Sequence, residues 1–162
     1  MASLTWSRVV AAGAIGLIAW RGQFWAMPLS ILVPCLIAAQ PTRSTAGATS
    51  LAYSAAASWP VIGVAKAYWP SSEASAVLMW MAAALLLSVP WFFCWTRKES
   101  LRPWTAAIAV VLTALPPLCI IGWASPLLSA GVLFPSSAWL GIAAALALPG
   151  LLIHKKTGSP HW

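Results

Sequence analysis

Apolar residues gather along the chain in six long runs, and short connections between the runs hold most of the charged side chains. A helix needs roughly 20 predominantly apolar residues to cross a bilayer. The pattern therefore predicts an all-α integral membrane protein, a bundle of about six transmembrane helices in one multi-span domain, residues 1–162. The expected spans are about 7–20, 24–39, 44–69, 73–95, 104–121 and 136–153.

Small and helix-breaking residues refine this pattern in two of the runs. Run 24–39 contains Pro28 near its start and Pro34 inside it, and it pairs with run 7–20 as a helical hairpin with short arms. In run 44–69, small residues recur at four-residue spacing, so one helix face is small throughout and favours close helix packing. These residues are Ser44, Ala48, Ala52 and Ala56. Pro60 is expected to kink this helix.

Composition supports a membrane protein over a soluble one. The chain is 61% hydrophobic and 7% charged, whereas soluble domains carry about 25% charged residues. The chain has nine Lys and Arg residues but only two acidic residues, Glu73 and Glu99, so its net charge is +7. These cations are scattered between apolar runs with no dense basic tract, so the expected partner is the lipid bilayer and direct nucleic-acid binding is not expected.

The distribution of the cations predicts the orientation. With six spans, seven cations fall on the side of the two termini and two on the other side. The first group is Arg8, Arg43, Arg97, Lys98, Arg102, Lys155 and Lys156; the second is Arg21 and Lys66. Because Lys and Arg accumulate in cytoplasmic connections, both termini are expected in the cytoplasm.

The connection between the last two spans, residues 122–141, has an unusual composition. Its sequence is GWASPLLSAGVLFPSSAWLG, which has no charged residue but contains Pro, Gly, Ser and Trp. Irregular backbone at membrane depth is tolerated only where protein or a water-filled cavity covers it. We therefore expect an outer re-entrant or interfacial loop that forms an interaction surface. Its expected anchors are Trp123, Pro126, Pro135 and Trp139.

The chain offers little material for catalysis. It has no Asp, so no Ser-His-Asp arrangement is possible, and it has no phosphate-binding loop, dinucleotide fingerprint or zinc-ligand spacing. Cys35, Cys94 and Cys119 lie in separate apolar segments and are expected to be buried free thiols. The sequence predicts no catalytic residue, no metal site and no cofactor.

Three stretches carry a resemblance to a known family. They are GLIAWRGQFWAMPLSILVPCLIA, ASWPVIGVAKAYWP and the segment 122–141. Together they resemble the conjugal transfer protein TraB of rhizobial and agrobacterial plasmids. That family is similar, in its membrane part, to the apolipoprotein N-acyltransferases, in which a membrane bundle carries a nitrilase-like domain. The chain reaches Trp162 where that domain would begin, so we expect no soluble catalytic domain here and carry over no catalytic residue.

The resemblance implies an inner-membrane protein that assists plasmid conjugal transfer and is not an enzyme by itself. Residues 122–141 would then present a surface to other conjugation or cell-envelope proteins. One alternative is the membrane half of an N-acyltransferase or amidase-like enzyme whose nitrilase-like domain is missing. Another is a small transporter or channel, although the expected spans offer only Ser and Thr as a polar path.

Overall fold

The computed structural model describes residues 2–69, 73–122 and 124–157, and among these residues it contains helices and turns but no strand. The first half comprises α1 (Ala2–Ala19), the 3-10 helix η1 (Phe24–Leu32), α2 (Val33–Ala38), α3 (Arg43–Ser58), α4 (Pro60–Tyr68) and α5 (Glu73–Cys94). The second half comprises η2 (Glu99–Leu101), α6 (Arg102–Ala114), η3 (Leu118–Ile120), η4 (Pro126–Leu128), α7 (Ser129–Leu133) and α8 (Ala138–Thr157). The predicted all-α class is confirmed.

Within the described residues, one helix is both long and apolar enough to cross a membrane, and it is the 22-residue α5. The apolar parts of three other helical segments are shorter, at Ser3–Ala19, Phe24–Ala38 and Ala138–Ile153. The bundle of six spanning helices therefore stays a prediction.

Proline explains why several runs are not single α-helices. Run 24–39, expected to be one helix, forms η1 with Pro28 inside it and then the six-residue α2, which has Pro34 in its first turn. The expected helix over 104–121 ends at Ala114, because Leu115 takes the extended conformation that a following proline favours. Pro60 divides run 44–69 into α3 and α4, in agreement with the expected kink.

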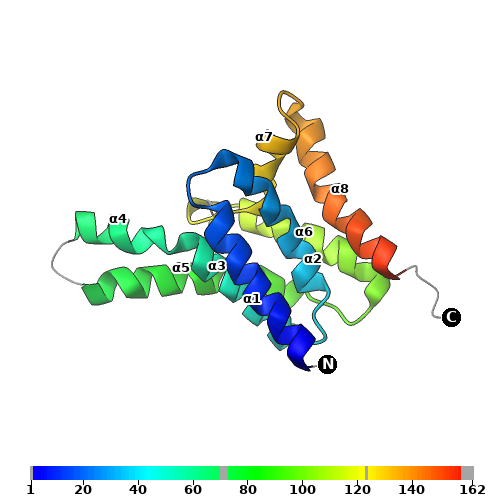
Figure 1. The fold of residues 1–162 in the computed structure, drawn as a ribbon, viewed down its shortest axis with the longest axis horizontal. Coiled ribbons are helices and arrows are strands. Elements are labelled where there is room, and N and C mark those ends of the chain that lie inside the picture. The colour runs from blue at the N-terminus through cyan, green and yellow to red at the C-terminus, as the bar shows by residue number, and fades with distance from the viewer. Residues whose placement is uncertain (1, 70–72, 123, 158–162) are drawn as a thin grey trace.

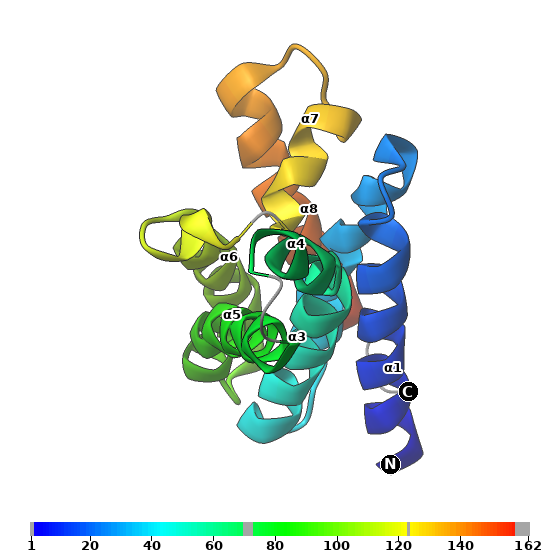
Figure 2. The ribbon, with the colours of Figure 1, turned by 90° about the vertical axis from the view of Figure 1, so that its left-hand side faces the viewer.

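Among the described helices, α1 and α3 share the most extensive contact, and they lie side by side in Figure 2. A Cβ added at Gly13 of α1 would lie 3.9 Å from the Cβ of Ala52, and one added at Gly16 would lie 3.1 Å from the Cβ of Ala56. Small residues on both helices thus allow the two backbones to approach. The small face predicted for α3 is used in this way at Ala52 and Ala56.

The main core lies where α1, α2, α3, α5 and α6 meet. Its larger members are Val33, Ile37, Tyr53, Trp91, Trp95, Val110 and, from α8, Ile153. Beyond this core, α4 and the first half of α5 extend away from the other helices as a hairpin, on the left of Figure 1. Its far end carries an ion pair between Lys66 and Glu73, the first residue of α5.

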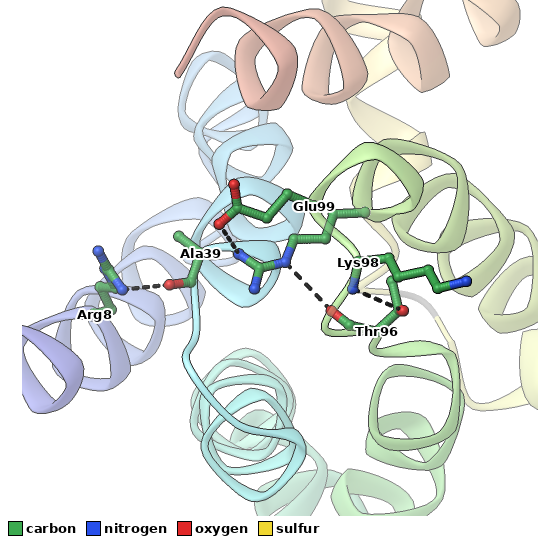
Figure 3. A network of polar contacts seen from close by, with 6 residues as sticks. Arg8, Ala39, Thr96, Lys98 and Glu99 are labelled. Carbon is green, nitrogen blue, oxygen red and sulfur yellow. Dashed lines mark hydrogen bonds and ion pairs between the residues drawn. The ribbon is translucent and has the colours of Figure 1, made fainter. Parts of the chain in front are cut away.

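Five of the seven cations predicted to share one side lie in, or next to, the connections between α2 and α3 and between α5 and α6. Arg8 donates to the carbonyl of Ala39 at the end of α2, and Arg102 donates from Nε to the carbonyl of Thr96 over 3.3 Å (Figure 3). Arg43 and Arg97 line a common pocket beside Thr96. We call this region the cation end and define it by Arg8, Arg43, Arg97, Lys98 and Arg102. The side chains of Lys155 and Lys156 lie outside the described residues.

Candidate interaction groove

Residues 115–122, 124 and 125 fold back over the end of α6, and we call them the fold-back. After the cis peptide between Pro116 and Pro117, η3 makes a single turn and the chain reaches Gly122. A Cβ at Gly122 would lie 2.8 Å from the carbonyl oxygen of Thr113 and 2.9 Å from that of Leu118. Contacts this short with backbone exclude a side chain, so the fold-back requires glycine at this position.

Two buried serines fasten the next segment to the first half of the chain. The hydroxyl oxygens of Ser129 in α7 and Ser30 in η1 lie 2.7 Å apart. Each also lies 2.8 Å from the carbonyl oxygen of Met27. Each hydroxyl has one proton, so two of these three contacts are hydrogen bonds at any moment. The start of α7 is thereby held against η1.

A tight turn joins α7 to α8 and closes the structure into an arch, visible at the top of Figure 2. Ser136 and Ala138 have φ values of 64° and 46°, a region that residues with a side chain seldom adopt. The Ser137 hydroxyl donates to the carbonyl of Phe134. A Cβ at Gly141 would meet Phe134 Cβ at 3.0 Å, so glycine lets the first turn of α8 pack against this turn.

The fold-back, α7 and the start of α8 form the walls of an open groove of about 690 Å³. Its walls are mainly apolar, and the polar side chains among its lining residues are two serines, one cysteine and Trp139, whose indole carries an N–H. The lining residues are Ala114, Cys119, Gly122, Ser125, Leu127, Leu128, Ala130, Gly131, Phe134, Ser136, Ala138, Trp139 and Ile142. No acid, base or charge-paired nucleophile is among them, so the groove is suited to binding an apolar group.

The four anchors expected from the sequence take different positions. Trp139 lines the groove and is 81% exposed, at the start of α8. Pro126 is buried in the first turn of η4, and Pro135 lies exposed in the turn before α8, outside the groove lining. Trp123 lies outside the described residues. Which of these residues contact a partner stays a prediction.

Several groove residues were missed by reading the sequence. Cys119 was expected to be buried, but its side chain is exposed and lines the groove, because α6 ends early and η3 turns outward. Gly131 also lines the groove, with nothing within 4 Å of an added Cβ. The proline pair at 116–117 was the available signal, since it ends α6 before Cys119 is reached.

Among the described residues, no group of three or more His, Cys, Asp and Glu side chains is arranged to hold a metal ion. No protein-family model matches the chain, and no solved structure gives a significant match.

Curated sequences do match. A probable conjugal transfer protein TraB of Sinorhizobium fredii is 33% identical over 144 residues, which is 88% of this chain and 37% of that protein. The conjugal transfer protein TraB of Agrobacterium fabrum is 33% identical over 145 residues, covering 83% of this chain and 34% of that protein. The resemblance expected from the sequence is confirmed: the chain is TraB-like over most of its length and spans about a third of the length of these conjugal transfer proteins.

Proposed function

We propose that this chain assists plasmid conjugal transfer as a multi-pass helical scaffold in the bacterial inner membrane. Its similarity to two TraB proteins over most of its length supports a role in conjugal transfer. The scaffold role rests on the groove, which has the shape and the apolar walls of a binding surface but contains no acid–base pair.

The observation that supports the membrane location is the number of large apolar side chains that are exposed on the helices. Leu78 of α5, Ile120 of η3 and Leu140 of α8 are 68%, 78% and 79% exposed, and many other large apolar side chains are exposed as well. Soluble monomers rarely expose contiguous apolar patches beyond a few hundred Å². Lipid around the helices would remove this surface from water.

The cation end supports the orientation that we propose. The start of α1, the end of α2 and the α5–α6 connection meet there, and Arg21 follows the opposite end of α1. Since basic connections stay in the cytoplasm, we place the cation end and both termini on the cytoplasmic side. The groove then belongs to the outer half of the molecule.

The occupant that we propose for the groove is an apolar segment of another conjugation or cell-envelope protein. Residues 103–153 contain no charged side chain, so a charged segment would lose water there without gaining an ion pair. Aromatic residues such as Phe134 and Trp139 on the wall and rim are of the kind enriched at protein–protein contacts.

Two glycines, one in the groove and one outside it, allow a direct test of this role. Gly131→Leu would place a side chain in the groove, where an added Cβ meets nothing within 4 Å. Gly63→Leu makes the same change on exposed α4, again with nothing within 4 Å. We expect Gly131→Leu and Trp139→Ala to lower transfer frequency at unchanged protein levels in the membrane fraction, and Gly63→Leu to leave it unchanged.

The same experiment separates the other possibilities. Normal transfer with both groove variants, at normal protein levels, would contradict the scaffold role. Crosslinking from Cys119, which lines the groove, identifies the occupant: a second copy of the chain or a lipid acyl chain there would rule out the proposed partner protein. Recovery of the chain in the soluble fraction would contradict the membrane location.

A further inference from the structure

The cation end contains a second pocket, of about 460 Å³, between the start of α3 and the connection that follows α5. It is lined by Thr42, Arg43, Ser44, Trp95, Thr96 and Arg97. Two arginines from segments far apart in sequence therefore line one pocket together with three residues that have hydroxyl groups. Such a combination of donors is suited to an oxyanion.

Among the described residues, no carboxylate pairs with either of these two arginines. The chain has two acidic side chains; Glu73 pairs with Lys66, and Glu99 lies 3.8 Å from Arg102. Arg43 instead lies over the ring of Phe92, with 5.9 Å from its guanidinium carbon to the ring centre. The positive charge in the pocket is thus left for a ligand.

The wall of the pocket is held in place by contacts of its own. Arg102 lies over the Trp95 ring, with 5.7 Å from its guanidinium carbon to the ring centre, and it donates to the Thr96 carbonyl. Thr96 Oγ1 accepts from the backbone N–H of Lys98 over 3.2 Å, one of the contacts drawn in Figure 3. A site formed in advance loses less conformational entropy when it binds a ligand.

Two further features favour an anion. Trp95 is 8% exposed, and its indole N–H is buried without a hydrogen-bond partner among the described residues. A buried donor without an acceptor is rare in folded proteins. The 16-residue α3 begins at Arg43, so the positive end of its dipole also faces this region.

We propose that this pocket binds a phosphate group through Arg43 and Arg97. Arginine presents two parallel N–H donors that match the spacing of phosphate oxygens. At the cytoplasmic face of a membrane, anionic phospholipids carry such phosphate groups, and basic pockets between helices bind their headgroups. That source rests on the proposed membrane location, whereas the phosphate chemistry rests on the pocket alone.

The test is a binding titration of the full chain in a neutral detergent. Short-chain phosphatidylglycerol, phosphatidylcholine, inorganic phosphate and a single-stranded oligonucleotide are added separately, and Trp fluorescence and native mass spectrometry report binding. Arg43→Gln and Arg97→Gln should each weaken phosphatidylglycerol binding about tenfold, the loss expected for one charge-assisted contact. Arg21→Gln removes the same charge outside the pocket and should leave the affinity unchanged.

The ligands distinguish the two sources of phosphate. Phosphatidylglycerol binding that is tighter than inorganic phosphate binding identifies a lipid headgroup, and equal affinities identify free phosphate. Equal loss of binding in all three arginine variants would overturn the proposal, because it would indicate a general charge effect. A preference for a single-stranded oligonucleotide over phosphatidylglycerol would also overturn it. Transfer assays on the groove variants do not involve this pocket, so failure of one proposal is distinguishable from failure of the other.

Discussion

Gly16 of α1 faces the carbonyl oxygen of Tyr53 in α3 so closely that a Cβ at Gly16 would lie 2.6 Å from that oxygen. Real Cβ atoms do not approach a backbone oxygen to this distance, so α1 and α3 can pack in this way only with glycine at position 16. Three residues earlier, a Cβ at Gly13 would lie at an ordinary 3.7 Å from the Ala52 carbonyl oxygen.

This pair of glycines gives the first prediction. Gly16→Ala should destabilise the protein by about 1–3 kcal/mol, because α1 must move away from α3. Gly13→Ala makes the same chemical change in the same helix and should be neutral or stabilising by up to about 1 kcal/mol, since alanine favours the helix. Thermal unfolding in detergent, followed by circular dichroism, measures both. Equal effects of the two substitutions would contradict the packing described.

The second prediction concerns a hydrogen-bond chain through Tyr53. Its hydroxyl accepts from Trp20 Nε1 over 2.9 Å and donates to the Ala124 carbonyl over 2.7 Å, so it connects α1, α3 and the fold-back. Tyr53→Phe should cost about 1–3 kcal/mol, because it leaves buried polar groups without partners. Tyr68→Phe, at an exposed position, should change stability by less than about 0.5 kcal/mol. If both substitutions have equally small effects, the hydrogen bonds of Tyr53 contribute nothing to the stability of the protein.

The third prediction concerns the attachment of α7 to η1. Ser129→Ala removes one of the two hydroxyl protons shared among Ser129, Ser30 and Met27, and it should cost about 1 kcal/mol. Hydrogen exchange of the α7 amides should accelerate, while exchange in α3 stays unchanged. Ser100→Ala, at an exposed position in η2, is the control. If exchange in α7 is unaltered, α7 is held by apolar packing alone.

The fourth prediction tests the orientation with the native thiol of Cys119. Cys119 is exposed, and under the proposed topology a membrane-impermeant maleimide should label it from outside intact spheroplasts. Cys119→Ser should abolish this labelling. In that background, Ser100→Cys places a thiol in the α5–α6 connection and should react only after the membrane is permeabilised. Labelling of the Ser100→Cys variant before permeabilisation would reverse the orientation.

Much of the helical framework could be predicted because it depends on local sequence. The apolar runs gave the all-α class, Pro60 gave the break between α3 and α4, and the small residues of α3 indicated a close helix contact. Composition alone could not distinguish a 3-10 helix from an α-helix in run 24–39. That difference depends on how the residues around Pro28 pack against α1 and α7.

The groove could be predicted only in part. The composition of segment 122–141 indicated a surface with aromatic and proline residues, and Trp139 does line the groove. Cys119 and Ala114 line the same groove because the fold-back packs Gly122 against Thr113 at the end of α6. No local sequence pattern encodes such a contact between segments. The arginine pocket escaped prediction for the same reason, since Arg43 and Arg97 are brought together by the packing of α3 against α5.

The short length of α6 has a consequence for access to the groove. Its 13 residues span only about 20 Å at 1.5 Å per residue, whereas the hydrocarbon core of a bilayer is about 30 Å thick. Under the proposed topology, α6 therefore ends within the outer leaflet, below the level of the headgroups. Residues 115–122 then lead from the end of α6 towards the outer surface, where Cys119 can meet a water-soluble reagent. A molecule embedded in the membrane can also reach the groove sideways, by diffusion in the plane of the membrane, and its effective concentration then depends on its density in the membrane.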